Sequence, residues 1–263
     1  TPGLRGGKAP LPAVRKSDGS RRPPVPAAQR TPEDREPLGP RVSSPALPGP
    51  RETSLRSPHL PDPTEPAPDP AATPVELPEQ DALPLLQSSP IIGARRIAWG
   101  SNYTFLVWID AGPGKLLPAV YKPRNGERPL YDFPSGSLYK REYATFIVSR
   151  ALGWPNVPLT VVRDGPHGVG SVQLYVDSDP GVTYFELIDA RRDDLRRFAV
   201  FDLLANNADR KAGHCLLGRD DRLWSIDHGL TFHPAFKLRT VMLEFWGETI
   251  PQDLVADIGA LLD

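Results

Sequence analysis

Apolar residues recur with regular periodicities only from about residue 83 onward. Before residue 180, runs of β-branched, aromatic and aliphatic residues bounded by Gly, Pro and Asp are typical of strands. We predict five of these strands, at residues 97–99, 103–109, 117–121, 157–162 and 170–176. The first two flank the small-residue stretch 100–102, so a tight loop should join them.

Three other stretches show the spacing of an amphipathic helix. The first lies between Ser137, a predicted N-cap, and Gly153, a predicted stop. Its apolar stripe consists of Tyr139, Tyr143, Phe146, Ile147 and Ala151. The second helix should begin near residues 193–194, and the third at Pro251.

The order of these elements predicts an α+β protein with two lobes in one domain, residues 83–263. A strand-rich N-lobe with one helix, at about residues 91–176, precedes a more helical C-lobe at about 182–263. A cleft between two such lobes is a natural site for a nucleotide.

The segment 1–82 differs in composition from the rest of the chain. Residues 1–80 contain 20 of the 33 prolines and no Phe, Tyr or Trp. Such a segment has little apolar surface to bury against its ordering entropy, so we predict disorder. A proline-rich stretch such as 21–26 could present an extended ligand to a weakly binding partner, and the alternative is a solvated tail.

Composition narrows the class of protein further. The net charge of -1 gives no reason to expect nucleic acid as a partner. The single cysteine, Cys215, excludes an internal disulfide and a cysteine cluster for zinc. No apolar run approaches the roughly 20 residues of a transmembrane span. We expect a cytoplasmic protein, and the excess of 24 Arg over 7 Lys suggests a GC-rich bacterial genome.

Candidate chemistry concentrates between Asn206 and Gly229. Two short apolar runs, 215–217 and 223–226, predict a hairpin with Asp209 before it and Asp227 after it. Folding the hairpin would bring both carboxylates to one cavity. Phosphoryl transfer uses such a pair, one Asp near the attacking hydroxyl and one on the metal that bridges the phosphates. The alternative is an Asp-rich pair of turns on a surface hairpin.

Lys122 ends a predicted strand beside the loop that contains Gly100 and Ser101. Backbone N–H groups of such a loop can bind a phosphate, although a plain hairpin turn has the same sequence pattern. Glu142 lies at the edge of the helical stripe, from where it would reach Lys122 or be solvated.

Six sequence blocks, in order, resemble the phosphatidylinositol 3-/4-kinase superfamily over about residue 95 to the end. They are Val120–Asn125, Glu142, Asn156–Thr160, Gln173–Val176, Asn207–Arg210 and Ile226–Leu230. The pattern is most similar to the type II phosphatidylinositol 4-kinases and to short actinobacterial proteins that carry the phosphatidylinositol 3- and 4-kinase name. The resemblance implies a bilobal kinase-like fold.

The resemblance also implies a role for each block. The nucleotide would contact Gly100, Ser101, Lys122, Glu142 and a hinge made of Gln173, Leu174, Tyr175 and Val176. The catalytic loop would supply Asp209, which serves the acceptor hydroxyl, and Arg210. Asp227 would bind Mg²⁺ or Mn²⁺ together with His214.

Two departures from the family pattern leave the function open. His214 stands where the family usually has an Asn metal ligand, and the loop before Ser101 has a single glycine, Gly100. The leading hypothesis is a kinase that transfers the γ-phosphate of ATP to an alcohol group on an inositol lipid, a protein Ser/Thr or a small molecule. The alternative is a nucleotide-binding pseudokinase that acts as a regulatory module.

Overall fold

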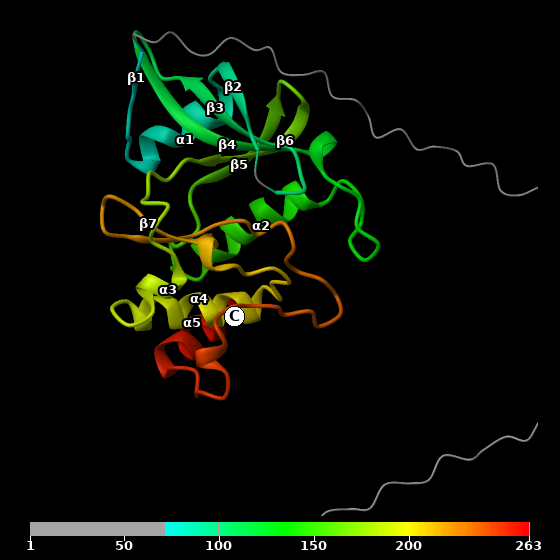
Figure 1. Cartoon of the computed structure of the whole chain (residues 1–263), viewed down its shortest axis with the longest axis vertical. Helices are drawn as coiled ribbons and strands as arrows, with labels where there is room; N and C mark the ends of the chain where they lie inside the picture. The colour runs from blue at the N-terminus through cyan, green and yellow to red at the C-terminus, as the bar shows by residue number, and fades with distance from the viewer. Residues whose placement is uncertain (1–71, 99, 263) are drawn as a thin grey trace, which may run out of the picture. The chain divides into compact units, whose positions relative to one another are not determined.

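The described part of the chain, residues 72–98 and 100–262, contains a six-stranded sheet and a two-stranded hairpin in this computed structural model (Figure 1). The sheet order is β2-β3-β4-β6-β5, and β1 pairs with the start of β4. These strands are β1 (Thr73–Pro74), β2 (Ile91–Ile97), β3 (Thr104–Asp110), β4 (Lys115–Pro123), β5 (Thr160–Gly165) and β6 (Gly168–Leu174). The β2 to β6 pairings are antiparallel, and β1 runs parallel to β4.

Burial alternates along the central strands, as expected of a sheet with one face on a core. In β3 the side chains of Phe105, Val107 and Ile109 are buried, with less buried residues between them. Together with the helices below, this sheet confirms the predicted α+β class. Residue 99, in the first predicted strand, and the tail before residue 72 lie outside the described residues.

Regular structure begins upstream of the boundary predicted at residue 83. The helix α1 (Glu79–Ser88) places Ala82 and Leu86 fully in the core, one helical turn apart. The ion pair between Arg150 and Glu79, with 2.6 Å between Nη2 and Oε1, ties the start of α1 to the end of the helix 138–151. Proline is unfavourable in the interior of a helix, and Pro84 lies within this short segment, so sequence reasoning missed the helix.

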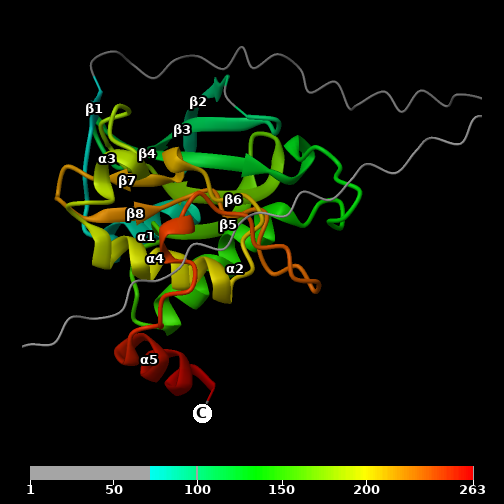
Figure 2. The same cartoon turned by 60° about the horizontal axis from the view of Figure 1, so that its bottom comes forward.

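The helix α2 (Leu138–Ala151) lies where the sequence predicted a helix, between Ser137 and Gly153, and it packs against β5 and β6 (Figure 2). Its buried face is rotated relative to the predicted stripe. Tyr143 and Ile147 are exposed, whereas the polar residues Glu142 and Ser149 are buried. The buried face is rotated because Glu142 and Ser149 form hydrogen bonds with His228 and Asn156, in loops that follow later in the chain.

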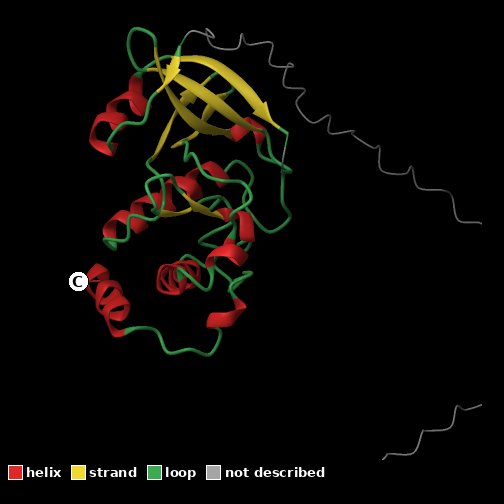
Figure 3. Cartoon of the chain, turned by 60° about the vertical axis from the view of Figure 1, so that its left-hand side comes forward, coloured by secondary structure: helices red, strands yellow, loops and turns green. Residues whose placement is uncertain are grey.

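Helices and loops make up most of the chain after β6 (Figure 3). The elements are α3 (Tyr184–Leu187), α4 (Arg192–Leu204), the hairpin β7 (Cys215–Leu217) and β8 (Leu223–Ser225), and α5 (Gln252–Leu262). Single 3₁₀ turns lie at η1 (Arg124–Gly126), η2 (Ala212–His214) and η3 (Leu243–Phe245). A second apolar core includes Tyr184, Leu195, Phe198 and Cys215. The predicted hairpin and the last helix are therefore present.

The helices of the described region are too short or too polar to cross a membrane.

Candidate active site

A cavity of about 410 Å³ collects most of the predicted site residues. Ten of them line it: Gly100, Ser101, Lys122, Glu142, Gln173, Leu174, Tyr175, Val176, Asp209 and Asp227. The residues come from the β2–β3 loop, β4, α2, the end of β6 and the loops on either side of the β7–β8 hairpin. Ile97, Val120, Leu216 and Ile226 add apolar walls. Such a mixture of apolar walls and a few converging charged groups is typical of a small-molecule site.

Lys122 lies between two carboxylates inside this cavity. Its Nζ donates to Oε1 of Glu142 and to Oδ1 of Asp227, the second at 2.8 Å. Glu142 is 3% exposed, and its Oε2 accepts the backbone N–H of His228 at 3.0 Å. One glutamate therefore connects β4, α2 and the loop after β8.

The charges of this triad determine the pKa of each member. Burial lowers the pKa of Lys122, but Asp227 and Glu142 together outweigh it, so the pKa lies above its usual value. The Lys122 charge holds the pKa of Asp227 well below its usual range, against the opposing effect of burial. Burial raises the pKa of Glu142, against the effect of Lys122. Lys122 and Asp227 are thus both charged at neutral pH.

The backbone of Asp227 adopts a left-handed conformation, with φ of 60°. Non-glycine residues adopt this region rarely, and Asp tolerates it better than most. The side chain remains 47% exposed, and Oδ2 is 3.3 Å from Nε2 of His214. Burial lowers the pKa of His214 below its usual value, and Asp227 only partly opposes this. His214 is not among the residues that line the cavity.

Asp209 lines the same cavity on the loop that follows α4. Its Oδ2 lies 2.8 Å from Nζ of Lys211, which also lines the cavity and is 61% exposed at its side chain. Sequence reasoning missed Lys211, although a cation two residues after a candidate catalytic Asp was visible. A mobile ammonium beside Asp209 places positive charge where an anionic group would enter.

Arg210, predicted to be catalytic, does not line the cavity. Its guanidinium is buried, and Nε and Nη2 donate to the two oxygens of Asp202 at 2.7 and 2.8 Å. Asp202 lies on the buried face of α4, a helix that the sequence predicted without a role for this residue. The sequence signal that could have identified Asp202 was an acidic residue on the same helix face as the apolar residues Leu195 and Phe198.

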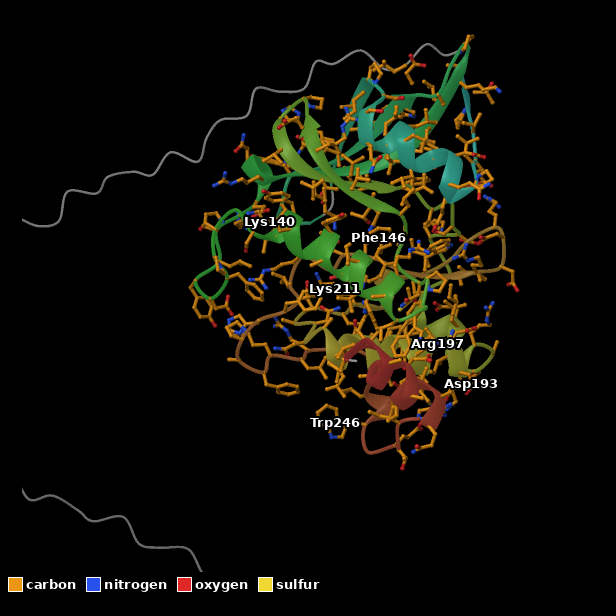
Figure 4. The ribbon with its side chains drawn as sticks, turned by 180° about the vertical axis from the view of Figure 1, so that it is seen from behind. Lys140, Phe146, Asp193, Arg197, Lys211 and Trp246 are labelled. Atoms are coloured by element: carbon orange, nitrogen blue, oxygen red, sulfur yellow. The ribbon has the colours of Figure 1, made fainter. Side chains whose placement is uncertain are left out.

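The segment after Gly229 contributes Leu230 to the cavity lining and then contacts the loop before α2. Lys237 pairs with Asp132, with 2.9 Å between Nζ and Oδ2, and so joins this segment to the loop before α2. Tyr131 and Phe236, beside these two residues in sequence, are 99% and 68% exposed. Trp246, further along, is also strongly exposed and projects outward (Figure 4).

Comparison with known proteins gives one close relative. The chain is 42% identical to Protein Rv2133c of Mycobacterium tuberculosis (strain ATCC 25618 / H37Rv), over 64% of this chain and 73% of that protein. The chain belongs to the same family as Protein Rv2133c. No family model matches the chain.

Solved structures give only distant likenesses. The Golgi casein kinase matches with a TM-score of 0.38 and 15% identity, over 68% of this chain and 61% of that chain. The same kinase with Mn/ADP bound gives 0.39 and 16%, over 70% and 61%. The Helicobacter pylori proinflammatory kinase CtkA gives 0.42 and 12%, over 67% and 80%. TM-scores this low support no conclusion about the function of the chain.

Proposed function

We propose that the protein is an ATP-dependent phosphotransferase that transfers the γ-phosphate to an alcohol group. The observation that carries this proposal is the position of Lys122 between Glu142 and Asp227, in one cavity with Asp209. Phosphoryl transfer requires little covalent chemistry from the protein. It requires a cation on the phosphates, a carboxylate that holds the metal and a carboxylate near the attacking hydroxyl. The cavity contains one candidate for each role.

Lys122 would bind phosphate oxygens of ATP, and Glu142 would hold its ammonium in place. The hinge from Gln173 to Val176 would bind the adenine ring, as the resemblance to the phosphatidylinositol 3-/4-kinase superfamily implies. Asp209 would accept the proton of the acceptor hydroxyl. Removing that proton as the oxygen attacks the γ-phosphate is the step for which a positioned base is needed.

The residues present suit a divalent cation that arrives with the nucleotide. Within residues 72–98 and 100–262, no three His, Cys, Asp or Glu side chains are grouped so as to hold a metal by themselves. The exposed carboxylate of Asp227 faces the cavity, and the unprotonated His214 lies beside it. Asp227, with His214 as a second donor, would hold Mg²⁺ or Mn²⁺, whose charge would neutralise the phosphate oxygens.

A test follows from incubating the protein with γ-phosphate-labelled ATP, Mg²⁺ or Mn²⁺, and a fractionated bacterial lysate. We expect label on one class of acceptor (lipid, protein or small molecule), and its extraction behaviour would identify that class. Asp209→Asn should retain nucleotide affinity and lose most transfer, because its contact with the hydroxyl matters mainly in the transition state. Equal loss of binding and transfer in Asp209→Asn would place Asp209 on the metal instead.

A nucleotide-binding pseudokinase is the second candidate. It is favoured by the pairing of both key carboxylates, Asp209 with Lys211 and Asp227 with Lys122 and His214, which leaves neither free. This candidate predicts ATP binding without transfer of label to any lysate fraction or to the protein itself. The cytoplasmic location and the acceptor class remain predictions.

A further inference from the structure

Asp202 lies below the cavity and is not among its lining residues. Its side chain is 1% exposed and accepts three hydrogen bonds. Two come from Arg210, as described above, and the third comes from Nδ2 of Asn207, 2.9 Å from Oδ1. A buried carboxylate with this many donors is costly to remove, because its partners would lose their acceptor.

The first connection from Asp202 leads to Asp209. Asn207 is fully buried, and its Oδ1 accepts the backbone N–H of Asp209 at 3.1 Å. The backbone N–H of Asn207 also donates to the carbonyl of Asp202 at 2.9 Å. Both bonds hold the loop that presents the Asp209 carboxylate to the cavity.

The second connection leads to Asp227 through Arg210. The Arg210 guanidinium donates to the carbonyls of Ile226 at 3.0 Å and His214 at 3.2 Å. Nη2 also lies 2.9 Å from Nε2 of His228 and 2.7 Å from Oγ of Ser225. Arg210 therefore contacts both sequence neighbours of Asp227, Ile226 and His228.

The two candidate catalytic carboxylates therefore stand on separate loops that share one support. Productive geometry must be held to within about 0.5 Å, which loops alone seldom achieve. Asp227 additionally has a sparsely populated backbone conformation that its surroundings must maintain. Arg210 makes two of its six side-chain contacts with Asp202 and the other four with residues 214, 225, 226 and 228. Asn207 makes one side-chain contact with Asp202 and one with the backbone of Asp209.

We propose that Asp202 is a positioning residue, which holds Asp209 and Asp227 in register through Asn207 and Arg210. The proposal rests on the phosphotransferase function proposed above. In this proposal, Arg210 links the two loops and does not contact the substrate.

Removing the charge of Asp202 alone would confound positioning with folding, because Arg210 would be left buried without a counter-ion. Asp202→Asn is therefore paired with the double variant Asp202→Asn/Arg210→Gln, in which neither charge remains. The double variant should unfold at a higher temperature than the single variant. Ser149→Ala, which removes a buried hydroxyl that bonds to Trp154 and Asn156, is the control for a general loss of stability.

The decisive experiment measures turnover, nucleotide affinity and hydrogen exchange in these variants well below their melting temperatures. In the double variant we expect kcat to fall about 10- to 100-fold, a usual cost of losing an outer support, with the affinity for ATP in the absence of a divalent cation little changed. Backbone amides of 206–211 and 225–229 should exchange faster than in wild type, while Ser149→Ala leaves both loops and kcat as they are.

If the double variant recovered wild-type turnover as well as stability, the positioning role of Asp202 would be overturned. Unchanged exchange in both loops would overturn it too, and this readout needs no activity. Absence of turnover in the wild type would instead contradict the proposed phosphotransferase function, and the exchange data would still decide the role of Asp202.

Discussion

Lys122 is the cation that joins the two carboxylates of the cavity. It faces Glu142, which is buried, and Asp227, whose side chain is about half exposed. The buried partner can only be stable as an ion while a cation is close, because burial of an unpaired charge is strongly unfavourable.

Lys122→Met should therefore destabilise the fold as well as weaken ATP binding. Removing one member of a buried pair costs about 3–5 kcal/mol, and the partial exposure of Lys122 favours the lower end. The double variant Lys122→Met/Glu142→Leu should recover part of this free energy of unfolding without recovering ATP binding. Denaturant unfolding of both variants measures the difference, and equal stability of the two would show that Glu142 is not stabilised by Lys122.

His214 stands where the phosphatidylinositol 3-/4-kinase superfamily, which the sequence resembles, usually has an Asn metal ligand. An imidazole nitrogen suits Mn²⁺ better than Mg²⁺, which prefers oxygen. We expect more activity, or tighter ATP binding, with Mn²⁺ than with Mg²⁺ at equal concentration. His214→Asn should shift the preference towards Mg²⁺. A ratio that is the same in wild type and His214→Asn would mean that His214 does not bind the metal.

At the scale of elements, sequence reasoning succeeded where one periodicity covered a whole element. Strands β3 and β4 and the β7–β8 hairpin alternate or cluster apolar residues between clear turn residues. At α2 it predicted the helix but misplaced part of the buried face, which carries Glu142 and Ser149. A hydrophobic stripe cannot reveal a helix face that is buried through hydrogen bonds, so the stripe pointed to Tyr143 and Ile147.

The same limit explains what could be predicted of the site. Asp209 and Asp227 were found from their spacing around a hairpin, because two loops at the ends of one hairpin must lie close. Lys122 gained its role from the resemblance. Asp202 and Lys211 were missed because their significance arises from contacts between α4, the loops and the cavity, which no local pattern encodes.

The helix α1 provides a prediction at the scale of one element. Leu86 is fully buried against the sheet, so Leu86→Ala should lower the free energy of unfolding by about 2–5 kcal/mol. Leu85→Ala is not a suitable control, because Leu85 is partly buried and also packs on this core. Gln87→Ala, at an exposed position of the same helix, should change stability by less than about 0.5 kcal/mol. Equal effects of both substitutions in chemical denaturation would show that α1 does not pack on the sheet in solution.

At the scale of the whole molecule, the buried His228 and the largely buried His214 link stability to pH. Burial lowers the pKa of His214, and burial with the nearby Arg210 lowers that of His228 well below its usual value. Below the ordinary value of about 6.5, the unfolded chain binds protons that the native state does not bind. Stability should therefore fall as the pH decreases from 7 to 5.5.

Each histidine can contribute up to about 1.4 kcal/mol per pH unit in this range. His228→Gln keeps an acceptor for Arg210 and removes one titrating group, so its stability should depend less on pH than that of the wild type. Thermal unfolding between pH 5.5 and 7 measures how stability depends on pH in the wild type and in His228→Gln. Subtracting one slope from the other removes the opposing contribution of Glu142, whose pKa is raised. Parallel slopes would contradict the inferred neutrality of His228.

The central claim is that the cavity around Lys122 and Asp227 binds ATP together with a divalent cation. Isothermal titration of ATP with Mn²⁺ into the wild type, Asp227→Ala and Asp209→Asn tests it most directly. We predict binding to the wild type and to Asp209→Asn with similar affinity, and loss of the metal-dependent part in Asp227→Ala. Absence of binding to the wild type at millimolar ATP, or equal metal-dependent binding by Asp227→Ala, would contradict the account.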